Sequence, residues 1–95
     1  MPVVKITRLP WLDRARYDEL ENRVRIGANH PLGLMMHAAG EAEGVFQIIE
    51  VWATADHAQR YEADRLRPAL SEIAADGADP AASITVFDAH YLVTP

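Results

Sequence analysis

The stretch from Val45 to Trp52 has the densest hydrophobic pattern in the chain. β-branched and aromatic residues fill every position except Gln47 and Glu50. The run is too short for a typical globular helix and its residue types favour strands, so it predicts a β-strand. Gln47 and Glu50 are three residues apart and point to opposite faces, so both faces are mainly apolar. Both faces therefore need cover. A helix that begins after Thr54 is one candidate, and a second subunit is the other.

The N-terminal part of the chain predicts a strand followed by a helix. Val3 to Leu9 has the composition of a strand, and Pro10, which cannot donate to a sheet ladder, ends it. Asp13 is a helix-capping residue, and an apolar stripe at helical spacing follows it as far as Ile26. Gly27 is well placed as the C-terminal stop of this helix.

Two more strands are predicted on either side of a loop. Leu32 to Ala39 predicts the second strand, and the polar link from Gly40 to Gly44 predicts a hairpin into Val45–Trp52. The composition of Asp76 to Pro80 is typical of a loop. Ser83 to Val93 predicts the last strand.

A second helix is predicted from Ala55 to about Ile73. Pro68 lies inside its apolar pattern, where a proline removes an amide donor and clashes with the preceding turn, at a cost of about 3 kcal/mol. We therefore expect the chain to break or turn near Arg67, with Pro68 opening a new short helix.

The predicted order is strand, helix, strand, strand, helix, strand. Right-handed crossovers then give a four-stranded antiparallel sheet with both helices on one face. This is the ferredoxin-like βαββαβ plait, an α+β fold, in one domain spanning residues 1–95. The face without helices carries apolar side chains, so we expect two sheets to pair back to back in a homodimer. An obligate interface of this kind buries on the order of 2,000 Å² in total.

Composition narrows the classes of partner. Nine basic and fourteen acidic side chains give a formal charge of −5 at pH 7, which argues against nucleic acid because phosphate binding needs a basic face. The absence of cysteine excludes disulfides and thiolate chemistry. The histidines lack metal-binding spacing, so no metal is expected. The chain has no apolar run near the length of a membrane span and no signal core at its N-terminus. We therefore expect a soluble cytoplasmic protein with no membrane partner.

Glu50 is the main candidate for acid–base chemistry. On a strand it shares a face with three apolar residues of the same run, Phe46, Ile48 and Trp52. A carboxyl group on a largely apolar wall is suited to act as a general acid or base. The alternative is an ion pair with an arginine such as Arg8 or Arg65, or a carboxylate reached by solvent.

Histidines and tyrosines supply further candidates. His37 either lines a cavity or lies on the opposite side of the sheet, depending on the hairpin register. Tyr17 and Tyr61 lie on the inner stripes of the two helices. Each either directs its hydroxyl at a ligand or packs against the sheet with the hydroxyl at the rim. His90 shares a strand face with Asp88, and this pair either orients an imidazole or lies at an edge or interface.

Two blocks of sequence carry a resemblance to a known family. They are HPLGLMMHAAG at residues 30–40 and GVFQIIEVWATADHAQRYEADRLRPAL at residues 44–70. Together they resemble the small dimeric α+β-barrel proteins, in particular the antibiotic-biosynthesis-monooxygenase-like group of actinobacterial type. That resemblance implies a dimer with a pocket between the sheet and the helices of each subunit. The activities it implies include cofactor-free oxygenation of aromatic polyketides, polyketide cyclisation, haem breakdown and aldoxime chemistry.

The resemblance also implies roles for single residues. Trp52 looks like the pocket tryptophan of the cofactor-free oxygenases. Those enzymes have an asparagine four residues earlier on the same strand, where this chain has Ile48, which cannot hydrogen-bond a substrate oxygen. The haem-degrading branch pairs a histidine on the second helix with an asparagine on the first. His57 and Asn22 match that pattern only loosely.

Two functions follow as hypotheses. The first is an enzyme acting on a small, apolar, aromatic or polyketide-like molecule without a tightly bound cofactor, by oxygenation or cyclisation. Glu50 and His37 would transfer protons, and Tyr17 and Tyr61 would polarise a carbonyl. An apolar substrate wall would come from three neighbours on one strand face, Phe46, Ile48 and Trp52. The second hypothesis is a ligand-binding or accessory dimer without turnover, which a tightly filled interior would favour.

Overall fold

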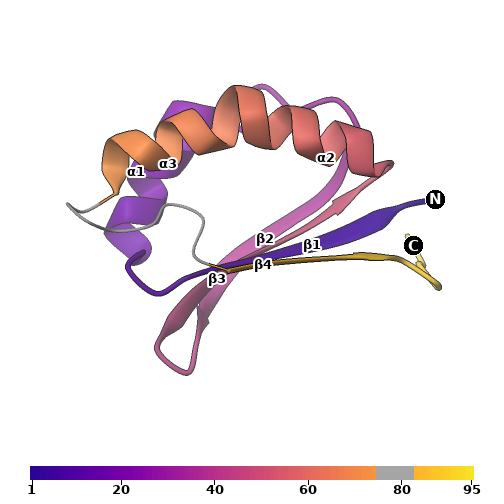
Figure 1. The fold of residues 1–95 in the computed structure, drawn as a ribbon, viewed down its shortest axis with the longest axis horizontal. Helices are drawn as coiled ribbons and strands as arrows, with labels where there is room; N and C mark the ends of the chain where they lie inside the picture. Colours follow the sequence, from indigo (N-terminus) through magenta and orange to yellow (C-terminus); the bar gives the residue numbers. More distant parts are fainter. Residues whose placement is uncertain (75–82) are drawn as a thin grey trace.

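The structure is a computed structural model that describes residues 1–74 and 83–95. Its described strands form one antiparallel sheet in the order β2-β3-β1-β4. The central strands are β3 (Val45–Trp52) and β1 (Val3–Leu9), and the edges are β2 (Leu34–Ala42) and β4 (Ser83–Asp88). Figure 1 shows all the helices on one face of this sheet. The predicted ferredoxin-like α+β fold is therefore confirmed.

The first helix, α1 (Arg14–Val24), begins at the predicted cap and ends earlier than predicted. The Asp13 carboxylate accepts a hydrogen bond from the backbone N–H of Arg16 at 2.8 Å. At the other end Arg25 adopts the left-handed conformation with a φ of 54°, and its N–H donates to the carbonyl of Glu21. The expected end at Ile26 with Gly27 as the stop is wrong, because Arg25 already makes the left-handed turn that ends the helix.

The second helical segment has three parts. They are α2 (Ala55–Tyr61), a π-helical segment η1 (Glu62–Leu66) and α3 (Arg67–Ile73). Pro68 lies in the first turn of α3, as predicted, where a missing N–H costs least. The chain does not turn away, however. It stays helical through η1, so the interruption is a change of helical pitch.

The hairpin between β2 and β3 has a tighter turn than predicted. Glu43 and Gly44 have φ angles of 53° and 78°, and two consecutive positive φ angles are the signature of a two-residue type I′ turn. The link expected from Gly40 to Gly44 is therefore wrong, because Gly40 to Ala42 belong to β2. Counting back from this turn, His37 pairs with Glu50 across the two strands.

The two edge strands also differ from their predicted lengths. β2 begins at Leu34 and not at Leu32, because Gly33 turns the chain with a φ of 86°. A register shift between Leu34 and Met36 then marks a bulge. β4 ends at Asp88 and not at Val93, since its partner β1 begins at Val3 and the preceding Pro2 has no N–H to continue the ladder, although its carbonyl accepts from the N–H of Ala89. The predicted loop from Asp76 to Pro80 lies outside the described residues.

The core lies between the sheet and the helices. Alternate residues of β1 and β3 point to the helices and are buried, from Val3 to Leu9 and from Phe46 to Trp52. The opposite face carries apolar residues in cross-strand rows. One such row is formed by Met36, Val51, Val4 and Phe87. Met36 and Phe87 at its two ends are 47% and 49% exposed.

None of the helices in residues 1–74 and 83–95 is both long and apolar enough to cross a membrane. The expected cytoplasmic location stays a prediction.

Replacing Gly33, Gly40 and Gly44 by alanine, one at a time, should separate the stability cost of backbone strain from that of a steric clash. At Gly33 a Cβ would lie 2.4 Å from a ring carbon of His57, and the φ is positive. At Gly44 only the φ is unfavourable, and at Gly40 a Cβ would meet nothing within 4 Å. In urea unfolding, Gly40→Ala should be nearly neutral and Gly44→Ala should lose about 1 kcal/mol. Gly33→Ala should lose about 2 kcal/mol or more. Equal losses at Gly33 and Gly44 would show that the His57 ring moves aside freely.

Candidate active site

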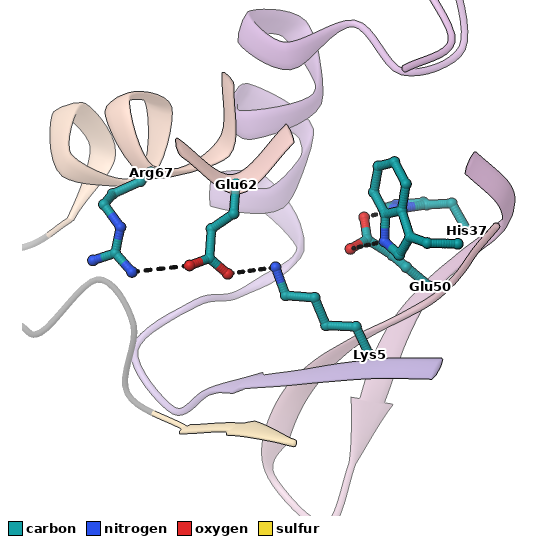
Figure 2. A network of polar contacts seen from close by, with 6 residues as sticks. Lys5, His37, Glu50, Glu62 and Arg67 are labelled. Atoms are coloured by element: carbon teal, nitrogen blue, oxygen red, sulfur yellow. Dashed lines mark hydrogen bonds and ion pairs between the residues drawn. The ribbon is translucent and has the colours of Figure 1, made fainter. Parts of the chain in front are cut away.

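Three polar side chains form a row across the helix-covered face of the sheet. His37 of β2 pairs with Glu50 of β3, and Glu50 pairs with Lys5 of β1. Glu50 is 1% exposed and Lys5 is 2% exposed. Buried charges are costly unless they are paired and hydrogen-bonded. Figure 2 shows that they are paired separately, with Glu50 beside His37 and Lys5 extended towards Glu62.

Glu50 and His37 form the inner end of a hydrogen-bonded chain. The Nδ1 atom of His37 lies 3.0 Å from Oε2 of Glu50. The indole N–H of Trp52 donates to the other carboxylate oxygen over a longer distance, 3.4 Å. An ionised carboxylate only accepts hydrogen bonds, so Nδ1 of His37 carries the hydrogen. In neutral His37 the Nε2 atom is then left as an acceptor.

Tyr17 of α1 forms the outer end of this chain. Its hydroxyl oxygen lies 2.6 Å from Nε2 of His37, to which it donates. Its ring stacks on Phe46, with ring centroids 5.3 Å apart. Burial raises the pKa of Tyr17 to about 12, and the negative charges of Glu21, Glu50 and Asp18 add to that effect. Tyr17 therefore remains a protonated donor at neutral pH.

Tyr61 of α2 lies deeper. Its ring packs against Trp52 with centroids 5.1 Å apart, and the guanidinium of Arg65 lies over it. Within residues 1–74 and 83–95 its buried hydroxyl has no hydrogen-bond partner. Burial raises its pKa, the charge of Glu50 adds to the rise, and Arg65 opposes it. The hydroxyl is thus a protonated donor without an acceptor, which is costly in a protein interior.

A pocket of about 420 Å³ lies beside Tyr17 and His37. It opens between α1, the connection that follows it, and the start of β2. Its other lining groups include the carboxylate of Glu21, the imidazole of His30 and the side chain of Met35. The volume falls in the range of small-molecule sites, and the lining mixes apolar surface with a few polar groups, as such sites do.

The candidate residues fall into two groups by depth. Tyr17 and His37 line the pocket, and Glu50 lies behind His37. The carboxylate does not line the pocket itself and is connected to it only by its hydrogen bond to the imidazole. The others are buried in the core, with exposures between 0% and 7%: Phe46, Ile48, Trp52 and Tyr61. Their roles in ligand binding stay predictions.

The alternative ion pairs of Glu50 are not formed. Arg8 hydrogen-bonds the hydroxyl of Thr85. Arg65 donates to backbone carbonyls, those of Val24 and Asn29. Both predicted arginine partners of Glu50 are therefore wrong.

Of the remaining histidines, His30 lines the pocket, and His57 and His90 lie away from this chain of contacts. His57 bonds the hydroxyl of Thr54 at 2.9 Å. His90 is exposed and lies beyond β4, so the expected strand face shared with Asp88 is not formed. Over the described part of the chain, no group of three or more His, Cys, Asp or Glu side chains is placed to hold a metal ion.

Sequence reasoning missed Lys5 and its partner Glu62. The signal was present in β1, because Lys5 occupies an inward position between Val3 and Thr7 in a strand of alternating burial. A lysine in that series indicates a carboxylate partner nearby, because an unpaired buried charge is costly. The partner could not be located, because the second helix changes pitch at Glu62.

Neither the protein-family models nor the curated proteins contain a match to this sequence. Solved structures do match. NE2512, of unknown function, from Nitrosomonas europaea, is 20% identical with a TM-score of 0.73, covering 99% of this chain and 94% of that one. SnoaB, a cofactor-independent oxygenase from Streptomyces nogalater, is 16% identical with a TM-score of 0.66, covering 99% and 98%. The heme-degrading protein Rv3592 from Mycobacterium tuberculosis is 23% identical with a TM-score of 0.58, covering 99% and 100%.

These likenesses show the fold. The same fold occurs in proteins provisionally assigned as antibiotic biosynthesis monooxygenases, so the fold that the resemblance predicted for a single chain is confirmed, and the dimer stays a prediction. The matched proteins differ in activity, and a shared fold does not determine which one this chain has.

The tautomer of His37 is directly measurable. In long-range ¹H–¹⁵N spectra its neutral form should carry the proton on Nδ1, because Glu50 accepts there and Tyr17 donates to Nε2. His30 and His90 are exposed and serve as internal references. Glu50→Gln should weaken the preference, because the neutral amide is a poorer acceptor. An Nε2–H tautomer for His37 in the unmodified protein would contradict the arrangement.

Proposed function

We propose that this protein is an enzyme that removes a proton from a small aromatic or polyketide-like substrate held beside Tyr17 and His37. One observation carries the proposal. A continuous hydrogen-bonded chain, from Tyr17 through His37 to Glu50, connects the 420 Å³ pocket to a fully buried carboxylate. A base oriented by a buried acid is the usual arrangement for general base catalysis.

In the proposed reaction Tyr17 turns its O–H to a carbonyl oxygen of the substrate. Nε2 of His37, which lies only 2.6 Å from the phenol oxygen, is then left without a hydrogen-bond donor. Nε2 accepts a proton from the carbon next to that carbonyl. The proton moves to Nε2, and the resulting imidazolium is stabilised by Glu50 through Nδ1–H.

In cyclisation the enolate carbon attacks a second carbonyl carbon of the same molecule, and the alkoxide formed takes the proton back from Nε2. In oxygenation the enolate carbon bonds to dioxygen as co-substrate, and the peroxide formed takes that proton to give a hydroperoxide; either route restores neutral His37. The chain's own side chains supply both the base and the donor for the proton step.

The buried aromatic residues form a deeper layer of the same site. Tyr61 offers a protonated hydroxyl without a partner among the described residues, which suits a second carbonyl oxygen of a substrate. The apolar wall behind Tyr17 is formed by residues of β3, namely Phe46, Ile48 and Trp52.

A ligand-binding or accessory protein without turnover is the second candidate. The observation that favours it is the tight filling of the interior, where Trp52 is 0% exposed and Ile48 is 3% exposed. A protein of this kind would use the pocket for binding alone. Haem breakdown gains no support from His57, which is committed to Thr54.

Assembly as a homodimer is part of the proposal. The helix-free face carries an apolar row with exposed ends, Met36 and Phe87, and monomers rarely leave such a face in water. Pairing two copies through this face would cover both sides of β3.

Proton removal can be tested without knowing the natural product. A panel of aromatic ketones with an acidic methylene group should exchange that hydrogen for deuterium in D₂O faster when the protein is present, as followed by NMR. Glu50→Gln should lower the rate about 100-fold, since His37 loses its anionic partner. Trp52→Ala should weaken ligand binding. Glu41→Gln, an exposed carboxylate change on β2, should leave the rate unchanged. Binding without exchange would favour the accessory protein.

Light scattering at micromolar concentration should report twice the chain mass of 10.5 kDa. Ile49→Asp places a charge on the helix-free face and should produce monomers, because the charge would be buried without a partner. Gln59→Asp, on the exposed side of α2, is the matched control. A single species of 10.5 kDa for the unmodified protein would rule out this dimer.

A further inference from the structure

A second chain of ion pairs lies next to the candidate site and runs from the buried Lys5 to the surface. The Lys5 ammonium lies 2.5 Å from Oε1 of Glu62, and the other oxygen of Glu62 lies 3.0 Å from the Arg67 guanidinium. We propose that Glu62 is a positioning residue that keeps Lys5 away from Glu50 and so leaves Glu50 free to hold His37. This role rests on the proposed function of Glu50.

Lys5 has two carboxylates within its reach. It stands directly opposite Glu50 on β1 and β3, and facing side chains on paired antiparallel strands have Cβ atoms about 5 Å apart. A lysine side chain is long enough to cross that distance. Both groups are almost fully buried, where opposite charges attract far more strongly than in water. Yet Figure 2 shows the Lys5 ammonium directed at Glu62.

The π-helical segment explains why Glu62 holds Lys5. The backbone N–H of Arg67 bonds the carbonyl of Glu62, five residues earlier. In an α-helix at 3.6 residues per turn, residues five apart point about 140° away from each other. The wider π turn brings them closer together, so Arg67 reaches the Glu62 carboxylate and fixes its direction. Burial by itself raises the pKa of Glu62, but the hydrogen bonds and charges of Lys5 and Arg67 outweigh it and lower the pKa.

Loss of Glu62 would redirect the lysine. An unpaired buried ammonium is costly, and Glu50 is the facing acceptor on the next strand. Lys5 would then compete with His37 for the Glu50 carboxylate. His37 would lose its orientation and the negative charge that stabilises its protonated form.

Other titratable groups near His37 and Glu50 stay unchanged in the variants below. Tyr17, Glu21 and His30 line the same pocket as His37, and the charge of Glu50 acts on Tyr17 and Tyr61.

Three variants test the proposal. In Glu62→Gln, the His37 Nδ1–H proton should exchange with water at least 10-fold faster, since its bond to Glu50 weakens, and a crystal structure should place the Lys5 ammonium against Glu50. Adding Lys5→Met removes the competing cation and should restore the slow exchange. Lys5→Met alone should behave as the unmodified protein. Glu72→Gln makes the same chemical change at a surface partner of Arg23 and is the matched control for Glu62→Gln.

The ketone exchange assay gives a second readout. Glu62→Gln should lower the rate about 10-fold, and Lys5→Met should rescue it. The NMR result is independent of turnover, so it decides the role of Glu62 even if no ketone reacts. The proposal is overturned if Glu62→Gln leaves the His37 proton unchanged, or if the double variant fails to restore it while its circular dichroism spectrum stays native.

Discussion

Burial of opposite charges on one row of the sheet is the constraint on which this structure depends. Glu50 and Lys5 face each other under the helices with exposures of 1% and 2%. A buried charge needs partners that satisfy its hydrogen bonds as well as its charge. Glu50 obtains them from His37 and Trp52, and Lys5 obtains its partner from Glu62. The helices are therefore tied to the sheet by polar contacts at fixed positions as well as by apolar packing.

The hairpin turn determines which residues take part in this row. Glu43 and Gly44 form the two-residue turn that places His37 opposite Glu50. A one-residue slip would move His37 to the helix-free face, since side chains alternate along a strand. The bulge between Leu34 and Met36 absorbs one extra residue at the start of β2. Local backbone geometry far from the pocket thus decides whether the imidazole reaches the carboxylate.

The sequence was sufficient to predict the fold because each element carries its own local signal. The apolar run of β3, the Asp13 cap and the position of Pro68 all belong to single segments. Element ends were less predictable. The end of β4 depends on how far its neighbour β1 extends, and the end of α1 depends on a left-handed Arg25, a conformation more common for glycine.

Residues of the candidate site could be predicted individually, but not their contacts. The alternation of β3 identified Glu50 and its apolar neighbours, and the inner stripe of α1 identified Tyr17. Whether Glu50 meets an arginine or His37 depends on register, which the composition of the link between β2 and β3 does not determine. The pairing of Lys5 with Glu62 depends on a π turn, for which the sequence gives no comparable pattern.

Stability alone does not account for the polar row. Well-packed apolar side chains in place of buried ion pairs are often neutral or stabilising, so a methionine at position 5 and a leucine at position 50 would fill similar space at less cost. The hydroxyls of Thr7 and Tyr61 add to that cost, because both are buried without a partner in the described part of the chain. Among the polar groups under the helices, Tyr17 and His37 line the pocket, and Glu50 lies directly behind His37. The proton transfer proposed above would use this arrangement, because a buried carboxylate behind the imidazole can orient it as a base.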